Sequence, residues 1–441
     1  MQKIDVAGLK IDALYKSDFL SQVLLRIKAN QKTWVITPYS EFLYHALRNK
    51  QLMDILNQAD YAVADGIGIF WAKKYLEIPL TAKNYYVKII QALWQIKYSL
   101  WAIIFNPKWI KSALPEKIPG SELVWDLAKL ASDNNLSIYL LGGFGDTPNL
   151  VAKKLISKFP NIIISGTSNK NSDDPTLYED LKKASPDMLL VAYGPIKQER
   201  WIAQSMPNLP VKLAIGLGGT FDYLAGKVPL PPKIMRAAGL EWLWRLFTQP
   251  KRILRIFHAT FGLIFEVLLY KIFQYLPYRK NVVGVIIKNK NLIFIAQRNP
   301  ENKKGNDRNE DENKYSDYWQ LPQGGTGNEE IIVAARREVA EETGIKSLKF
   351  LKISGATHTY NFSSSWFRLF GKEYRFKGQT QSIAYFEFTG DDSEIHLDND
   401  ELINWRWTDI DQLKNSIHPE RQTLTEIVVK DLKEMQEKAI I

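Results

Sequence analysis

Three glutamates in the C-terminal part of the chain have the spacing that most clearly suggests chemistry. Residues 329–343 have a helix-forming composition, and Gly344 follows them as a helix stop. Glu338, Glu341 and Glu342 therefore fall at positions i, i+3 and i+4 on one helical face. Clustered carboxylate oxygens are the ligands that Mg²⁺ and other hard divalent cations prefer. On the helix pattern alone, an ordinary solvated acidic face is the alternative.

The residues around these glutamates favour the metal site. Gly324-Gly325, then Glu329, then the run 337–345 together resemble the Nudix box, although four residues, one fewer than in the family, separate Gly324 from Glu329. The resemblance implies water attack on a phosphoanhydride, assisted by bound Mg²⁺ or Mn²⁺. The residues that it implies for metal binding are Glu338, Glu341 and Glu342, with Glu342 and Glu401 also implied in catalysis.

Other blocks relate this region to one branch of the Nudix enzymes. Residues 278–282, 319–325, 377–386 and 401–407 look like the RNA 5′-pyrophosphohydrolase and dinucleoside-polyphosphate hydrolase branch. The resemblance spans roughly residues 278–435 and implies a nucleoside polyphosphate or nucleoside diphosphate derivative as the substrate. It also implies that Arg279 faces the substrate phosphates and that Arg337 pairs with Glu329.

A second set of candidate residues follows strand-like runs in the N-terminal part. Thr37 and Asp65 each end a short apolar run, and Gly142 and Gly143 follow the run 137–141. Open α/β sheets bind ligands at the carboxyl ends of their parallel strands. A carboxylate there can accept a proton, and backbone N–H groups of glycines can bind a diphosphate. Taken singly, the Asp65-Gly66 motif is more commonly a turn than a catalytic site, and the glycines after residue 141 are also what a tight turn between strand and helix needs.

Several blocks in one order make residues 1 to about 255 similar to the WecG/TagA/CpsF glycosyltransferases. These enzymes transfer an N-acetylhexosamine, typically N-acetylmannosamine, from UDP to a polyprenyl-diphosphate-linked sugar in envelope polymer synthesis. The resemblance implies an inverting transfer without a metal or other cofactor, and the N-terminal part has no Asp-x-Asp motif. It implies Asp65 as the base with Thr37 beside it, in a pocket lined by Gln198 and Asp222. The blocks that carry it are 37–38, 65–68, 194–201, 216–226 and 239–245.

Positive side chains complete the candidate donor and acceptor site. Lys117 stands where the family often has arginine, so a point charge replaces a bidentate fork. Arg245 ends the 239–245 block, and Arg252 and Arg255 follow it. The family has a basic C-terminal appendage at these positions, which is thought to reach the active site when the enzyme meets its lipid substrate. The candidate substrate-binding residues of this half are thus Gly142, Gly143, Gln198, Asp222, Lys117, Arg245, Arg252 and Arg255.

These observations predict an α/β protein of two domains. A Rossmann-like glycosyltransferase domain is expected over residues 1–250, with an amphipathic aromatic and basic insertion at 85–114. An amphipathic basic linker helix at 251–277 should follow. Residues 278–441 should form an α/β/α-sandwich Nudix domain with a mixed sheet, in which the almost wholly polar stretch 301–317 is expected to be a mobile loop.

Charge is distributed unevenly along the 441 residues. The net charge is +10, made of +14 in residues 1–280 and −4 in residues 281–441. Two stretches, 83–118 and 251–280, carry +5 each. Basic patches of this kind suit nucleic acid, anionic membranes or phosphate-rich substrates. The chain contains no cysteine, which excludes disulfides and thiolate metal sites and favours an intracellular setting.

The two basic stretches are also rich in aromatic residues. Charged residues interrupt both apolar runs, so neither is expected to be a regular membrane-spanning helix. We expect helices lying in the plane of a membrane surface, which would place the protein in the cytoplasm at the inner face of the cell membrane. The alternative is a pair of helices packed on the protein's own core. Self-association is left open.

Two further functional alternatives follow from the sequence. The shortened Nudix box is compatible with a domain that only binds a nucleotide and regulates the transferase. The basic stretches are also compatible with RNA binding by an RNA-directed pyrophosphohydrolase, although they lie within or directly after the transferase half.

Overall fold

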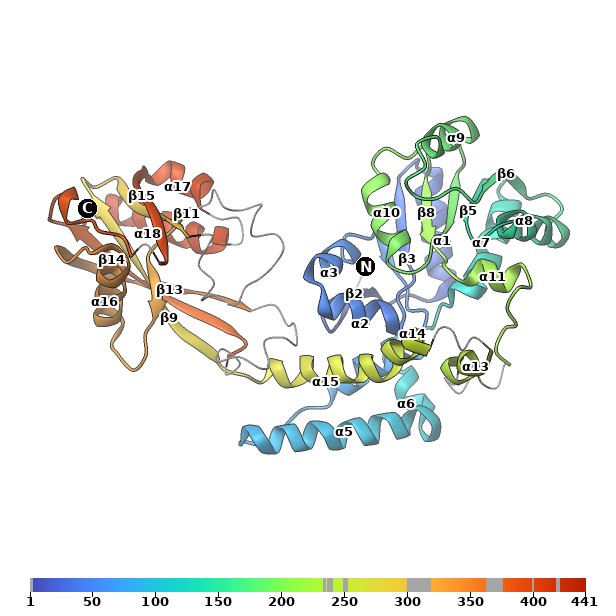
Figure 1. Cartoon of the computed structure of the whole chain (residues 1–441), viewed down its shortest axis with the longest axis horizontal. Coiled ribbons are helices and arrows are strands. Elements are labelled where there is room, and N and C mark those ends of the chain that lie inside the picture. Colours follow the sequence, from blue (N-terminus) through green and yellow to red (C-terminus); the bar gives the residue numbers. More distant parts are fainter. Residues whose placement is uncertain are drawn as a thin grey trace. The chain divides into compact units, whose positions relative to one another are not determined.

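The computed structural model describes residues 3–232, 235, 241–248, 253–299, 319–361, 376–398, 400–417 and 421–441. The chain divides into two compact units, and the division falls between Gln274 and Tyr275. The expected loop at 301–317 lies outside the described residues. Figure 1 shows the elements of both units along the chain.

The first unit is built on a six-stranded parallel sheet. Its strand order is β4 (Tyr61–Ala62), β3 (Thr33–Ile36), β8 (Leu213–Gly216), β7 (Met188–Ala192), β5 (Ser137–Gly142) and β6 (Ile163–Ser168). Strands β3, β7 and β8 are buried along their whole length, which accounts for their continuous apolar sequences. The predicted Rossmann-like α/β fold is confirmed. The carboxyl ends of all six strands lie at one edge of the sheet, where Thr37 and Gly216 follow or end adjacent strands.

Helices cover the sheet and bury its apolar side chains. The main core joins α1 (Lys16–Lys28), α7 (Gly120–Asp133) and α8 (Thr147–Lys158) to strands β3, β5, β7 and β8. An antiparallel hairpin of β1 (Lys3–Val6) and β2 (Leu9–Asp12) precedes them. The remaining helices around this sheet are α2 (Ser40–Arg48), α3 (Lys50–Leu56), α4 (Ile67–Glu77), α9 (Leu177–Ala184), α10 (Lys197–Ser205) and α11 (Thr220–Leu224).

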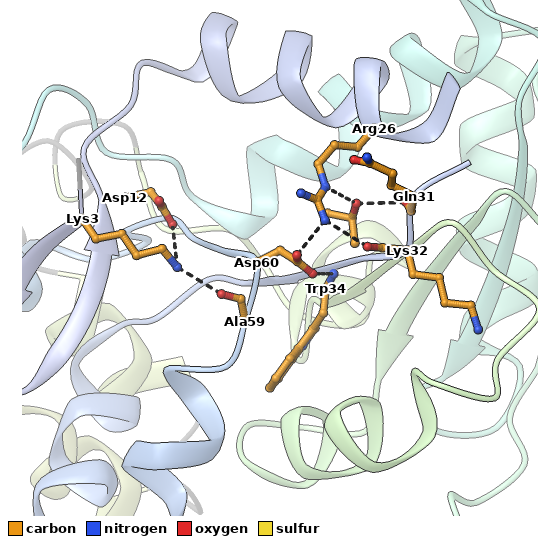
Figure 2. A network of polar contacts seen from close by, with 9 residues as sticks. Lys3, Asp12, Arg26, Gln31, Lys32, Trp34, Ala59 and Asp60 are labelled. Atoms are coloured by element: carbon orange, nitrogen blue, oxygen red, sulfur yellow. Dashed lines mark hydrogen bonds and ion pairs between the residues drawn. The ribbon is translucent and has the colours of Figure 1, made fainter. Parts of the chain in front are cut away.

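Two aspartates fix strand β4, which leads to Asp65. The Asp60 carboxylate accepts from the Trp34 backbone N–H at 2.8 Å and from Arg26 Nη2 at 2.7 Å, so it joins the starts of β3 and β4 (Figure 2). The buried Asp12 carboxylate accepts from the Ala62 N–H at 2.8 Å, and burial raises the pKa of Asp12. Because both strand ends are held by side chains, the position of the following Asp65 loop is well defined.

The aromatic and basic insertion forms a long helix, α5 (Tyr85–Phe105), followed by α6 (Pro107–Lys111). Its buried positions are the small residues Ala92, Ser99 and Ala102, which allow neighbouring helices to approach closely. Trp71 of α4 donates from Nε1 to Ser99 Oγ at 3.0 Å, and Tyr75 donates from its hydroxyl to the Ala92 carbonyl at 3.1 Å. The small residues and polar contacts therefore fix one face of α5 against α4.

The C-terminal segment of the first unit comprises α13 (Glu241–Thr248), α14 (Ile253–Phe257), a π-helical turn η2 (His258–Gly262) and α15 (Leu263–Gln274). Among the described residues, one helix, Ile253–Gln274, is long and apolar enough to cross a membrane. Its charged residues nevertheless bind within the first unit. Lys271 Nζ donates to the Tyr75 carbonyl and to Gln95, while Glu266 pairs with Arg48 at 3.4 Å.

The apolar stripe expected on this helix is divided between two surroundings. Leu268 and Ile272 are buried, whereas Phe257 and Phe261 are exposed. Glu266 is buried as well. The π-helical turn lies between the two halves, and its wider spacing of residues rotates the faces relative to each other. The helix therefore both packs on the domain and presents aromatic residues to solvent.

The second unit is a seven-stranded mixed sheet with helices on both faces. The main path runs β11 (Trp319–Gln320), β10 (Leu292–Arg298), β9 (Tyr278–Lys288), β14 (Gly378–Phe388) and β13 (Leu348–Asn361), with β12 (Gln323–Gly325) beside β9 and β15 (Leu402–Asp409) beside β10. Among the described strands of this sheet, only β9 and β14 pair in parallel. Helix α16 (Ile331–Thr343) packs on one face, and α17 (Ile410–Ser416) and α18 (Gln422–Glu437) pack on the other. The predicted α/β/α sandwich is confirmed.

Candidate functional sites

A pocket of about 840 Å³ lies at the carboxyl edge of the parallel sheet. Seven of the predicted site residues line it, and they come from widely separated parts of the sequence. These residues are Thr37, Asp65, Lys117, Gly143, Gln198, Asp222 and Arg255. The fold therefore gathers most of the predicted donor and acceptor residues of the first unit in one cavity.

Asp65 and Thr37 occupy neighbouring strand ends in this pocket. The Asp65 backbone N–H donates to the Pro38 carbonyl at 3.0 Å, which holds the two loops together. The Asp65 side chain is half-buried, and its Oδ2 lies beside Gly120 at the start of α7. Thr37 is buried and donates to the Gly216 carbonyl at 3.4 Å. A half-buried carboxylate on a fixed loop is suited to accept a proton from a bound hydroxyl.

Gln198 is held in the pocket wall by a residue that the sequence analysis did not single out. Gln198 Oε1 accepts from the Gly218 N–H at 3.0 Å, and its Nε2 donates to Glu199 Oε1 at 2.8 Å. Glu199 is 0% exposed, and its Oε2 accepts from the N–H of Ile196, which has φ +71°. Burial raises the pKa of Glu199 to about 7. Adjacency to Gln198 was the only signal of this role in the sequence.

The glycines at the end of β5 adopt a backbone conformation that requires glycine, and Gly143 reaches the pocket. Gly142 has φ +91°, and a Cβ there would lie 2.9 Å from the Ala192 backbone, so only glycine fits. Gly143 lines the pocket, whereas Gly142, the last residue of β5, is not among the lining residues. The side chains of Asp222, on α11, and Lys117, before α7, are half-buried in the same cavity.

Of the three predicted arginines, Arg255 is the one whose side chain lies within the described residues. Arg255 lines the pocket, and its Nε and Nη2 donate to the two oxygens of buried Glu41 at 2.9 and 3.0 Å. This bidentate pairing raises the pKa of Arg255 and holds its side chain at the cavity. Arg245 lies in α13, but its side chain is outside the described residues. Arg252 is also outside them.

In the second unit, α16 carries the predicted carboxylate face. It begins at Ile331, two residues later than expected, and ends at Thr343, where Gly344 follows as the cap with φ +76°. Strand β12 brings Gly324 against the helix, where an added Cβ would overlap the Glu338 carboxylate. Gly325 lies equally close to the guanidinium of Arg279, because a Cβ added at Gly325 would lie 2.7 Å from Arg279 Nη2. The two glycines thus let both side chains approach the β12 backbone.

Arg337 binds the glutamates of the box together. It donates to Glu329 at 2.8 Å, as the resemblance implied, and also to Glu338 at 2.8 Å and Glu341 at 2.9 Å. A fourth bond reaches the Gly325 carbonyl at 2.9 Å. Hydrogen bonds to Glu329 and Glu338 raise the pKa of Arg337. The shorter spacing between Gly324 and Glu329 does not prevent the arginine from joining helix, loop and β12.

Glu342 is the most deeply buried of the predicted metal ligands. It is 6% exposed and accepts from the Gln323 N–H at 3.2 Å. Burial raises its pKa to about 8, and the nearby carboxylates of Glu401 and Glu338 act in the same direction. Burial also raises the pKa of Glu338. Glu338, Glu342 and Glu401 therefore lie in a negative environment that a cation would stabilise.

The donor set fits a hard divalent cation in chemistry, since all of its ligand atoms are carboxylate oxygens. Among the described residues, however, no three acidic or histidine side chains are gathered at ligating distance. Arg337 contacts Glu338 and Glu341, so rearrangement of those side chains must accompany metal binding. Trp405 and Trp407 pack against the core cluster beside α16.

Fold and sites together define a two-domain enzyme, in which a Rossmann-like transferase unit precedes a Nudix hydrolase unit. The sequence profile of the Glycosyl transferase WecG/TagA/CpsF family matches residues 4–105 and 101–277, and the NUDIX domain profile matches residues 277–427. The chain belongs to the Glycosyl transferase WecG/TagA/CpsF family, and its C-terminal region contains a NUDIX domain.

Named relatives match the first unit. Proteins of Staphylococcus aureus strains MRSA252 and NCTC 8325 / PS 47 are each 26% identical to this chain over 261 residues. The matches cover 58% of this chain and 88% of each relative. Both relatives are described as N-acetylglucosaminyldiphosphoundecaprenol N-acetyl-beta-D-mannosaminyltransferase.

Solved structures match over about a third of the chain. An Ap4A hydrolase of C. elegans, solved as a binary complex, is 18% identical, with coverage of 35% of this chain and 98% of its own and a TM-score of 0.26. The MutT protein of Methanosarcina mazei Go1 is also 18% identical, with coverage of 37% and 97% and a TM-score of 0.26.

Proposed function

We propose that the first unit transfers an N-acetylhexosamine, most simply N-acetylmannosamine, from UDP to a sugar carried on a polyprenyl diphosphate. The observation that carries this proposal is the single pocket that gathers Asp65, Thr37 and Gln198 with positive side chains. The printed activity of the Staphylococcus relatives supplies the substrate class. Synthesis of a cell-envelope polysaccharide is the process that such a transfer serves.

The proposed transfer needs no metal. The acceptor hydroxyl gives its proton to Asp65, its oxygen attacks the anomeric carbon, and the bond to UDP breaks with both electrons leaving on the diphosphate. Attack opposite the leaving group inverts the anomeric configuration. Lys117 and the backbone of the Gly143 loop, which line the pocket, would stabilise the departing diphosphate. Thr37 and Asp222 orient the two sugars.

Replacement of the base tests this mechanism. Asp65→Asn removes a proton acceptor with little change of volume, so transfer should fall by about 10²–10⁴-fold while UDP-sugar binding persists. Asp18→Asn makes the same chemical change on an exposed position of α1, outside the pocket, and should leave transfer unchanged. Near-normal transfer by the Asp65 variant would exclude it as the base.

We propose further that the second unit hydrolyses a nucleoside polyphosphate or a nucleoside diphosphate derivative. Mg²⁺ or Mn²⁺ would be held by Glu338, Glu341 and Glu342, and when bound it would neutralise phosphate oxygens and lower the pKa of the attacking water. Glu401 is the nearby carboxylate available to accept the proton of that water, and Arg279 beside Gly325 is available to the substrate phosphates.

One observation favours a second candidate for this unit, a nucleotide-binding regulatory module. The guanidinium of Arg337 already neutralises two of the three proposed metal ligands, Glu338 and Glu341. A domain that keeps this pairing would bind phosphates without hydrolysing them. A screen of nucleoside polyphosphates and nucleotide sugars with varied Mg²⁺ and Mn²⁺ separates the candidates, because turnover of any one of them selects the hydrolase.

We propose finally that the first unit binds peripherally to the cytoplasmic face of the cell membrane. Helix α5 exposes an aromatic and aliphatic surface that includes Tyr86, Trp94 (66% exposed) and Trp101, and Lys97 lies 5.2 Å from the Trp94 ring centroid. Phe257 and Phe261 add exposed apolar area from the neighbouring segment. Exposed aromatics interleaved with lysine suit an anionic bilayer surface.

Vesicle co-sedimentation tests the electrostatic part of this proposal. Changing Lys97, Lys108 and Lys111 to Gln should weaken binding to anionic vesicles, since each lysine near the surface contributes about 1 kcal/mol. A matched variant with Lys153, Lys154 and Lys183 changed to Gln removes the same charge from exposed positions elsewhere in the unit. Equal sedimentation of the two variants would contradict the assignment of the surface to α5 and α6.

A further inference from the structure

The pocket of the first unit has an apolar half that sugar transfer does not use. Its polar lining includes Thr37, Asp65 and Asp222, whereas the part that is here called its apolar half is lined by side chains of α4, α5 and the α14–α15 segment, which also contributes Arg255. These apolar lining residues are Trp71, Leu100, Ile103, Ile256, Leu263 and Ile264. A nucleotide sugar and an acceptor sugar are both polar, so neither explains a wall of this composition.

The packing of three helices creates this apolar wall and satisfies its polar atoms elsewhere. Trp71 is buried, and its only polar atom donates to Ser99. The Thr260 hydroxyl donates to the Ile256 carbonyl at 2.7 Å within its own helix. Lys271, whose pKa burial lowers to about 8, donates to Tyr75 and Gln95. The polar groups near the wall, including Arg255 with its two bonds to Glu41, are thus bonded to protein, and Leu100, Ile103 and Ile264 present hydrocarbon to the cavity.

The apolar half also continues to the surface. Phe261 lines the pocket and is 60% exposed, so its ring belongs to both the cavity and the outer face. On α5, Leu100 and Ile103 line the cavity, while Trp101 and Ile104 beside them are exposed. Helices α5 and α15 pack against each other (Figure 1). An apolar chain lying in this half would therefore lead outward onto the surface assigned above to the membrane.

We propose that the apolar half of the pocket binds the first isoprene units of the acceptor's polyprenyl chain. The inference rests on the proposed function, because it takes the acceptor to be lipid-linked. It adds a tail-binding site, formed by α5 and the α14–α15 segment, to the polar site that binds the reacting sugars. A flexible, branched hydrocarbon fits a wall of Leu, Ile and Trp side chains, and burial of each methylene favours binding. The reacting sugar is thereby held at Asp65 by its own lipid.

Acceptors with a constant sugar-diphosphate head and tails of one, two and four isoprene units test this site on the full chain. In vesicle-free buffer, KM should fall at least tenfold from the shortest to the longest tail. Leu100→Asn and Ile103→Asn should abolish most of this fall. Ile156→Asn, the same substitution on an exposed position of helix α8, should retain it. Transfer with one KM for all tails would overturn the tail site but leave the proposed function intact.

A second measurement detects binding of the tail directly and needs no variants. A farnesyl diphosphate that carries a photoreactive benzophenone should label residues of α5 or of the segment 253–264, and unlabelled farnesyl diphosphate should compete. Labelling confined to other parts of the chain would overturn the inference. Labelling at these helices without transfer to any acceptor would support the site and refute the proposed function. The two failures are therefore distinguishable.

Discussion

Replacing Glu199 by glutamine should remove a pH dependence from the stability of the first unit. Glu199 is fully buried, and burial raises its pKa from 4.5 to about 7. The folded protein therefore holds this proton more tightly than the unfolded chain does. Stability from this group is fully present below about pH 4.5 and is lost as the pH rises through 7.

The two pKa values give the size of the effect. At pH 5 the unfolded carboxyl is mostly ionised and the folded one is mostly protonated, whereas at pH 8 both are ionised. The linkage relation then gives a loss of about 2.5 kcal/mol of unfolding free energy between these pH values. Asp12 and Glu266, whose pKa values burial also raises, act in the same direction. Comparison with the Glu199 variant cancels their contribution.

Glutamine cannot ionise, but it also cannot accept both hydrogen bonds that Glu199 accepts. Its NH₂ group would face either the Ile196 N–H or the Gln198 amide, which costs about 1–3 kcal/mol at all pH values. The variant should therefore be less stable than the wild type at pH 5, and the difference should shrink or reverse by pH 8.

Pulse proteolysis in urea, with peptides of residues 120–216 quantified, would measure the unfolding of this unit within the full chain. The wild type and the Glu199→Gln variant are compared at pH 5, 6, 7 and 8. Parallel pH profiles for the two proteins would refute the proton assignment, whatever the size of the constant offset between them.

Two further predictions concern the Nudix unit. Gly324→Ala places a methyl group against the Glu338 carboxylate and should reduce hydrolysis on the order of 10²-fold. Gly355→Ala is the control, because the added methyl group meets nothing within 4 Å, and it should leave hydrolysis unchanged. Equal activities of the two variants in a nucleotide hydrolysis assay would contradict the proposed role of the close approach at Gly324. Chelation of divalent cations should stop hydrolysis but not sugar transfer, and Glu342→Gln should reproduce the loss selectively, because it removes an anionic ligand. Sugar transfer that stops on chelation and is restored by Mg²⁺ would contradict the metal-independent mechanism.

Local sequence patterns determined much of both sites. The glutamate spacing and the glycine stop predicted helix α16 to within two residues at its start, because helix periodicity and a left-handed cap are local properties. Apolar runs ending in Thr37 and Asp65 predicted parallel strand ends, and strands β3 and β4 lead to these residues side by side. Motif order along the chain then carried the family resemblance, which requires no knowledge of side-chain contacts.

Tertiary structure alone decided which polar groups are buried and with which partners. Burial raises the pKa of Glu199, both carboxylate oxygens of Glu41 accept from Arg255, and Lys271 donates to the Tyr75 carbonyl across 196 residues of chain. No periodicity encodes such pairings, because they depend on where distant segments meet. Whether the helix over residues 253–274 lies in the core or on the surface also depends on where distant segments meet. Packing on α2, α4 and α5 buried Glu266 and Lys271, and the π-helical turn left Phe257 and Phe261 exposed.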